Sequence, residues 1–279
     1  MIFNTIYRRE RRVSSRSCRM PVVIALFDAV MAIMVLMNMA IAVDHARETS
    51  VIDYDAFLNI FVVMAMAEFV FMMVMAPAFS SGSISNEAER KTLDMMLTTK
   101  LRASDIVTGK LVWSLSSAML VIASSLPILA ILFVYGYVRI QKLAIFVLTM
   151  FVMEIYVGSL GILASAAVSR TAVATAVSYG ALLFLTCGTS LLCTVAANVA
   201  GTQTGMTGLL YLNPLTPFVA FLGSVQRTAG SMDALWAMMG FSGDADMNAI
   251  AVRAVAVQLM ASAGFVVLAV RCISPQRRK

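Results

Sequence analysis

Charged side chains are scarce in this chain, and histidine and cysteine are scarcer still. Only 13% of the residues are charged and 60% are hydrophobic, whereas a soluble domain carries about 25% charged residues. This composition excludes an ordinary soluble domain and indicates a polytopic membrane protein. With one histidine, and four cysteines that show no C-x-x-C spacing, we expect neither a metal site nor a disulfide framework.

The sequence motifs of nucleotide-hydrolysing and protease sites are also missing. No stretch has the form G-x-x-x-x-G-K-[ST] that cradles phosphates, because Gly109-Lys110 is followed by Leu111. The only histidine, His45, lies between two apolar runs, where it cannot pair with a serine inside the membrane. We therefore expect this chain to hold no cofactor, no metal and no catalytic residue of its own.

What the chain does have is long apolar runs. About 20 apolar residues suffice to cross a hydrocarbon core ~30 Å thick, and six runs reach this length. The first is too long for the apolar region of a signal peptide, which has ~7–15 residues. We predict an all-α integral membrane protein with one permease domain, residues 21–279. Its six predicted transmembrane helices are Pro21–Val43, Phe57–Phe79, Val107–Val134, Leu143–Val168, Ala172–Val199 and Ala249–Cys272.

Two segments outside these runs have a character of their own. Residues 1–20 are basic and carry apolar residues at roughly helical spacing, which predicts an amphipathic helix on the cytoplasmic leaflet. A disordered basic tail is the alternative. In residues 201–248 the apolar stretch Leu209–Gly223 is too short to span, and Asn213-Pro214 and Pro217 interrupt it. This pattern predicts a re-entrant or interfacial pair of short helices on the outer side.

The distribution of lysine and arginine predicts the orientation. With the N-terminus inside, only Arg47, Arg139, Lys142, Arg227 and Arg253 of the 21 lysines and arginines fall on the outer side. Because cytoplasmic loops carry the excess of basic residues, we predict that both termini are cytoplasmic. The basic residues flank apolar runs, so anionic lipid, and not nucleic acid, is the expected contact.

One charged and periodic stretch, Ser83–Lys110, lies between the second and third runs. Asn86 followed by Glu89 predicts a helix N-cap with its capping-box partner. The spacings Glu87–Lys91 and Arg90–Asp94 are (i, i+4) pairs that support a helix. We therefore predict one amphipathic helix of about three turns over residues 84–97.

The same stretch resembles the signature of type-2 ABC transporter permeases. The similarity covers EAERKTLD at Glu87–Asp94, LTT at Leu97–Thr99 and DIVTGK at Asp105–Lys110. Lys100 departs from the family pattern, which usually has proline there. The resemblance implies that the helix at 84–97 is a cytoplasmic coupling helix that docks onto a separate ATPase subunit, which binds ATP and Mg²⁺. The implied contact residues are Glu87, Glu89, Arg90, Lys91, Thr92, Leu93, Asp94 and Leu97.

A few ionisable residues fall inside the predicted spans: Asp28, Glu68, Glu154 and Arg253. Glu68 and Glu154 lie near the middle of their spans, where an ionised group costs at least ~2.5–3.5 kcal/mol. They either line a translocation path, together with Asn213 and Pro214, or make hydrogen bonds between helices. Both interpretations stay open at the level of sequence.

The expected function is that of a transmembrane permease subunit in an ATP-driven ABC exporter of the cell membrane. The resemblance implies two ATPase subunits and a second permease, either another copy of this chain or a homologous one. One alternative is an ion- or proton-coupled secondary transporter that uses Glu68 and Glu154. However, such transporters tend to show broken helices in matching halves, and only one proline-broken segment is present. Another alternative is a membrane scaffold that moves no substrate.

Overall fold

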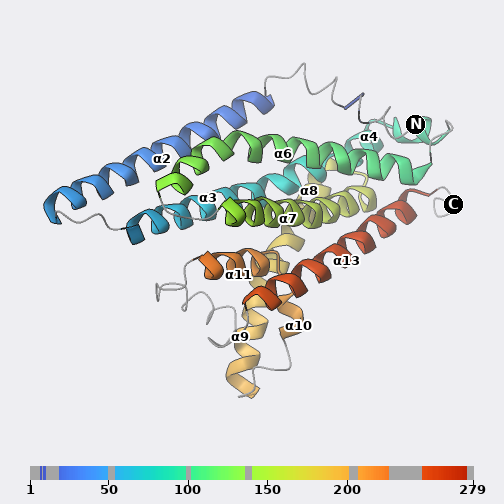
Figure 1. Ribbon diagram of the computed structural model, residues 1–279. Helices are drawn as coiled ribbons and strands as arrows, with labels where there is room; N and C mark the ends of the chain where they lie inside the picture. The colour runs from blue at the N-terminus through green and yellow to red at the C-terminus, as the bar shows by residue number, and fades with distance from the viewer. Residues whose placement is uncertain are drawn as a thin grey trace.

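The chain folds into a bundle of long helices. The computed structural model describes residues 7, 9–10, 19–49, 54–98, 102–135, 140–200, 207–225 and 247–274, and within these ranges it contains no strand. Six helical stretches are long and apolar enough to cross a membrane, and Figure 1 shows most of them running lengthwise through the molecule. They are α2 (Arg19–Thr49), α3 (Tyr54–Ser80), α6 (Ala103–Tyr135), α7 (Ile140–Ala167), the continuous stretch of α8 (Thr171–Leu183), η1 (Phe184–Gly188) and α9 (Thr189–Ala200), and α13 (Met247–Ile273).

The six predicted spans are confirmed as helices. The first helix continues beyond the predicted span to Thr49, and no glycine or proline interrupts it there. The fifth span is not a uniform α-helix, since a π-helical turn, Phe184–Gly188, separates α8 from α9. Such turns insert one extra residue into a helix and are frequent at functional sites.

Some predicted segments lie outside the described residues. This holds for nearly all of the interfacial helix at 1–20, and for residues 201–206 and 226–246 of the outer segment. In the described part of that segment the chain forms α10 (Thr207–Leu210) and α11 (Leu215–Val225), two short helices on either side of Asn213-Pro214. The predicted pair of short helices is found, and its depth in a bilayer stays a prediction.

The surface of the bundle is apolar where a bilayer would contact it. On α2, the side chains of Leu26, Ile33 and Leu36 are 67%, 63% and 68% exposed. The opposite face of the same helix buries Phe27 and Met31. Contiguous exposed apolar surface on this scale is unfavourable in water, so the outward face of α2 fits the hydrocarbon core of a membrane.

Helices α3 and α7 form the centre of the bundle, with α11 packed against them. Phe69 of α3 stacks on Phe218 of α11 with ring centroids 4.1 Å apart. Phe61 of α3 meets Phe146 of α7 edge to face at 6.2 Å. In Figure 1, α11 lies between α7 and the α9–α10 pair. Because α11 has only 11 residues, it is too short to cross a membrane, and it instead fills the core from one end.

Glycine allows α3 and α7 to approach closely at the other end of the bundle. A Cβ atom on Gly161 would lie 1.9 Å from the Ser80 hydroxyl oxygen and 3.0 Å from its Cβ. Small residues at such contacts let helix backbones pack tightly in membranes. Gly161 is such a small residue, and it lets α7 lie directly against Ser80 of α3.

We expect Gly161→Ala to lower the thermal stability of the purified chain in detergent micelles. The added methyl group would push the Ser80 hydroxyl off the Ala76 carbonyl oxygen, which it now donates to at 2.8 Å. Overpacking of this kind costs about 1–3 kcal/mol.

The matched control is Gly180→Ala, where a Cβ would meet nothing within 4 Å. The double variant Ser80→Ala/Gly161→Ala should recover part of the loss, because it removes the nearest clashing atom. Equal melting temperatures for the Gly161 and Gly180 variants would contradict this account of the helix contact.

Candidate functional site at the α4–α5 segment

The segment between α3 and α6 forms two short helices instead of one. They are α4 (Ser85–Glu89) and α5 (Leu93–Leu97), so the prediction of a single helix over 84–97 was wrong. After α4 the chain turns at Lys91, whose φ of 58° is left-handed. The Thr92 N–H bonds to the Glu87 carbonyl at 2.9 Å, and the Lys91 N–H bonds to the Ala88 carbonyl at 3.0 Å. This pair of bonds is a Schellman motif, which ends a helix.

The start of α4 is capped by a residue from another span. The hydroxyl oxygen of Ser165, on α7, accepts the backbone N–H groups of Ile84 and Ser85, both at 2.9 Å. Asn86 lies inside α4 and accepts a bond from Arg90 Nε at 3.1 Å, so the predicted capping box was wrong. The first N–H groups of a helix need an acceptor, and here α7 supplies it.

Glu89, the last residue of α4, in turn caps the start of the fifth span. One of its carboxylate oxygens accepts the backbone N–H of Thr171 at 3.2 Å and the hydroxyl of Thr171 at 2.5 Å. Thr171 is the first residue of α8, and Arg170, which precedes it, makes no side-chain cap. A carboxylate is favoured at this position because it bonds to free N–H groups and meets the positive end of the helix dipole.

Glu87 is buried in an ion pair with the third span. Its carboxylate lies 3.0 Å from the ammonium group of Lys110, on α6, and 3.6 Å from the guanidinium group of Arg9. Lys110, which is only 3% exposed, also donates to the carbonyl oxygen of Ser83 at 2.6 Å and to Glu10 at 3.3 Å. The predicted Glu87–Lys91 pair is replaced by this cluster, because Glu87 points into the protein.

The predicted contact residues therefore fall into three groups. Glu89, Arg90 and Lys91 are exposed, and Thr92 is half-buried. Glu87 and Leu93 are buried, at 8% and 2% exposure. The side chains of Asp94 and Leu97 lie outside the described part of the structure.

The α4–α5 segment also covers a cavity. This cavity has a volume of about 340 Å³ and lies between the segment and the ends of α7 and α13. Leu93 on its wall belongs to an apolar cluster with Ile162 of α7 and Ile273 of α13. Its lining residues are Ile84, Ala88, Leu93, Ser165, Ala166, Ala167, Val168, Ser169 and Cys272.

The two predicted intramembrane glutamates do not contact each other in the described structure. Glu68 accepts a hydrogen bond from the Ser125 hydroxyl of α6 at 2.6 Å, and its second oxygen has no partner among the described residues. Glu154 is 1% exposed, and neither of its oxygens has a hydrogen-bond partner there. Their assignment to a translocation path stays a prediction.

Asn213 joins the short helices to the π-helical turn of the fifth span. Its amide nitrogen lies within hydrogen-bonding distance of the Thr186 carbonyl oxygen and the Ser190 hydroxyl, at 3.0 and 2.9 Å. Its side-chain oxygen accepts the Leu215 N–H at 3.0 Å. The side-chain amide of Gln258, on α13, donates to the backbone carbonyl oxygen of Asn213 at 2.9 Å. Asn213 and the neighbouring Pro214 are buried, so Asn213 has a clear structural use.

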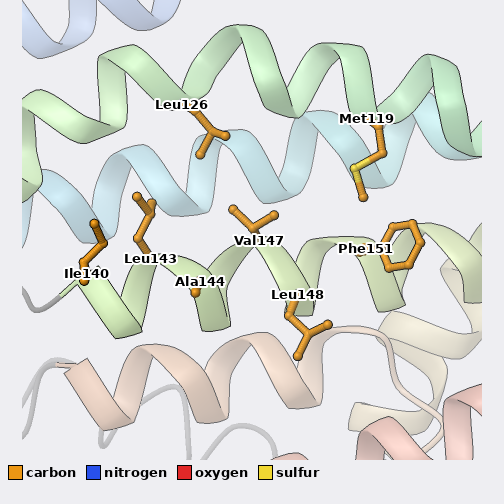
Figure 2. A pocket seen from close by; sticks show the side chains of 8 residues that line it. All are labelled: Met119, Leu126, Ile140, Leu143, Ala144, Val147, Leu148 and Phe151. Atoms are coloured by element: carbon orange, nitrogen blue, oxygen red, sulfur yellow. The ribbon is translucent and has the colours of Figure 1, made fainter.

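An apolar groove lies between α6 and α7 (Figure 2). Its volume is about 460 Å³, and no polar side chain lines it. Lys142, which lies between the lining residues Ile140 and Leu143 in the chain, bonds to the Ser224 hydroxyl oxygen of α11 at 2.9 Å. The lining residues are Met119, Leu126, Ile140, Leu143, Ala144, Val147, Leu148 and Phe151.

Sequence reasoning missed the residues that hold the α4–α5 segment in place. Lys110 is the last residue of the stretch that resembles the family signature, and the structure shows this lysine bonded to the segment at Ser83 and Glu87. Sequence reasoning did not find Ser165 or Thr171 as caps. These two residues are more than 70 positions away in the sequence from the residues that they contact in α4. No local sequence pattern predicts such a contact.

The six apolar helices and the capped segment define a multi-pass membrane protein. A family model described as "ABC-2 family transporter protein" matches residues 4–273, and the chain therefore belongs to this family. The resemblance read from the sequence is confirmed. Members of the family are membrane transport subunits and not catalytic domains. Comparison with curated proteins finds no match.

We expect Lys110→Met to destabilise the chain strongly. It leaves the buried Glu87 carboxylate without its nearest cation, and breaking a buried ion pair costs about 3–5 kcal/mol. The double variant Glu87→Gln/Lys110→Met should be more stable than the single Lys110 variant, since no uncompensated charge remains at position 87. Melting temperatures of the four proteins in the cycle measure the coupling. Additive effects of the two substitutions would contradict a direct pairing.

Proposed function

We propose that this chain is the permease subunit of an ATP-driven exporter, and that a separate ATPase subunit docks on the exposed side of the α4–α5 segment. Family membership and the absence of a phosphate-binding loop support a complex in which this chain is the transport subunit and a separate subunit hydrolyses ATP. The observation that carries the proposal is the difference between the exposed side of the segment and the side bonded to the spans. One side is open to a partner, the buried side is bonded to helices α6 and α7, and the exposed Glu89 is bonded to α8.

The exposed side offers contacts of two kinds. Arg90 and Lys91 present positive charge at the turn between the two helices, and Met95 of α5 is 70% exposed. A large exposed apolar side chain with charged neighbours is typical of an interface anchor with a polar rim. In this proposal the buried Glu87 and Leu93 shape the segment from inside, while Glu89, Arg90 and Lys91 lie nearest the partner.

The bonds between the segment and the spans provide the route for transmitting motion. Ser165 connects the segment to the fourth span and Thr171 to the fifth. Lys110 connects it to the third, and the second runs directly into it. A rigid shift of the segment, driven by closure of the ATPase on ATP and Mg²⁺, would thus act on four spans together. This mechanism exchanges inward-facing and outward-facing states.

The remaining parts of the proposal follow from the resemblance and from the charge distribution. The complex contains two ATPase subunits and two permeases, and it lies in the cell membrane with both permease termini in the cytoplasm. Substrate moves out of the cytoplasm or the inner leaflet. Purified complex that moves substrate only inward would overturn the direction.

One observation favours a second candidate, an ion- or proton-coupled secondary transporter. Glu154 is buried in α7 without a hydrogen-bond partner among the described residues, and isolated intramembrane acids are frequent in proton relays. Transport that persists after collapse of the membrane potential and the proton gradient, with ATP present, would exclude this candidate. Loss of transport under those conditions would favour it.

We expect the double variant Arg90→Glu/Met95→Asp to lose the ATPase in a pull-down from co-expressing cells. It reverses one charge and removes one apolar contact on the exposed side, and neither side chain is part of the core. Retention should fall at least tenfold, as a loss of about 1.4 kcal/mol gives.

The matched control for this pull-down is Arg271→Glu, an exposed charge reversal on α13 that lies outside the segment. All three proteins must elute as a single species in gel filtration. If the double variant keeps the ATPase as well as the control does, the dock lies elsewhere on the permease.

We expect Ser165→Ala/Thr171→Val to keep the ATPase bound but to weaken coupling. The two substitutions remove hydrogen bonds worth about 0.5–1.5 kcal/mol each and leave the exposed residues Arg90, Lys91 and Met95 unchanged. The readout is a fluorophore on Cys187, which is exposed in the fifth span, in a chain whose other cysteines are replaced. Its response to ATP and vanadate should fall by half or more.

The control for the coupling experiment is Thr149→Val/Ser262→Ala. Among the described residues, these two hydroxyls bond only within their own helices, to the carbonyl oxygens of Ile145 and Leu259. An unchanged response in the Ser165/Thr171 variant, with a bound ATPase, would show that these caps do not transmit the motion.

A further inference from the structure

Two acidic side chains from different helices meet on neighbouring serines of α6. Asp28 of α2 accepts a bond from the Ser124 hydroxyl at 3.3 Å. Glu68 of α3 accepts one from the Ser125 hydroxyl at 2.6 Å. Because Ser124 and Ser125 are adjacent in the chain, the two carboxyl groups converge on one short stretch of α6. We call Asp28, Glu68, Ser124 and Ser125 the acidic cluster.

Hydrogen-bond donors are in short supply in the acidic cluster. Each serine has one hydroxyl proton, and a carbonyl of its own helix competes for it. Ser124 lies 2.8 Å from the Val121 carbonyl oxygen, and Ser125 lies 3.0 Å from that of Ile122. The second oxygen of Glu68 has no partner among the described residues, and Glu68 is 0% exposed. The acidic cluster therefore has more hydrogen-bond acceptors than donors.

Positive charge is missing from the acidic cluster as well. In the part of the chain that the structure describes, the ion pairs involve Arg9, Arg47 and Lys110, and none reaches Asp28 or Glu68. A buried polar group is normally hydrogen-bonded, and a buried charge is normally paired. The described residues supply no cation to the acidic cluster and no hydrogen-bond partner to the second oxygen of Glu68.

One member of the acidic cluster is accessible from the side of the bundle. Asp28 is half-buried, and its neighbours Leu26 and Val30 are 67% and 48% exposed on the outward face of α2. Next to it, Phe27 stacks on Phe71 of α3 with ring centroids 3.9 Å apart. A ligand that approaches from this side would meet an acid at the surface, a second acid behind it, and an apolar wall.

We propose that the acidic cluster binds a single positively charged group, either an alkali-metal ion or the ammonium group of an apolar amine. Both satisfy the same need: an ammonium N–H donates to the free oxygen of Glu68, and a small metal ion takes carboxylate and hydroxyl oxygens as ligands. Asp28 makes the first contact and Glu68 the inner one. This site concerns ligand recognition and does not depend on where the ATPase docks.

The test uses the purified full chain in lipid nanodiscs and follows its thermal unfolding by intrinsic fluorescence. One arm adds sodium chloride, with choline chloride at equal ionic strength as its blank. The other adds N,N-dimethyldodecylamine, which is protonated at neutral pH, with 1-dodecanol as its uncharged blank. We expect a saturable rise of several degrees over the blank in at least one arm, and the arm that responds identifies the source of the charge.

Asp28→Asn and Glu68→Gln should each reduce this rise by half or more, because both remove charge and keep the side-chain shape. Glu154→Gln is the matched control, since it makes the same change at a buried glutamate outside the cluster, and it should keep the full response. No rise in either arm, an undiminished rise in the Asp28 and Glu68 variants, or a loss in the Glu154 variant would overturn the proposal.

A second measurement avoids variants that fail to fold. Dicyclohexylcarbodiimide modifies carboxyl groups in apolar surroundings, and mass spectrometry locates the adducts in the wild-type chain. The stabilising cation should slow modification of Asp28 or Glu68 severalfold and leave Glu154 unaffected. Equal protection of all three acids, or of none, would contradict a site at the acidic cluster.

Discussion

A polar group in the interior of a membrane protein has no water to bond to, and the structure of this chain follows from that constraint. Backbone N–H and carbonyl groups are satisfied inside six long helices. At the ends of some helices, another element supplies the missing partner. Ser165 caps the start of α4, and Glu89 caps the start of α8. Asn213 bonds to the π-helical turn of the fifth span.

These caps join distant parts of the chain through directional bonds. The hydrophobic effect that drives apolar burial is non-directional. A serine oxygen that accepts two N–H groups, or a lysine that bonds to both Ser83 and Glu87, has one favourable position. These bonds fix the position of the α4–α5 segment relative to its supporting helices. The proposed transmission of motion from an ATPase to the bundle requires fixed contacts of this kind.

The long spans could be predicted from sequence because they depend on local composition alone. The turn at Lys91 could not, since lysine rarely adopts a left-handed backbone. Glu87 has two lysines as candidate partners: Lys91 one turn along, and Lys110 in the next span. In the structure Glu87 pairs with Lys110. The choice of partner follows from which face of the segment is buried, and burial is a property of the whole fold. Ser165 and Thr171 carried no local signal, because a cap from another helix leaves no pattern near either residue.

The buried polar residues differ in how completely the protein satisfies them, and this difference separates structural from functional use. The side chain of Asn213 has partners for both its nitrogen and its oxygen, so packing accounts for its presence. Glu68 and Glu154 have oxygens without partners in the described structure, although an apolar residue at either position would avoid the cost of desolvation. A cost that the fold does not offset points to a partner outside the fold. The neighbours of Glu68 include a second acid, Asp28, which is accessible. A cation is therefore the partner that best fits Glu68.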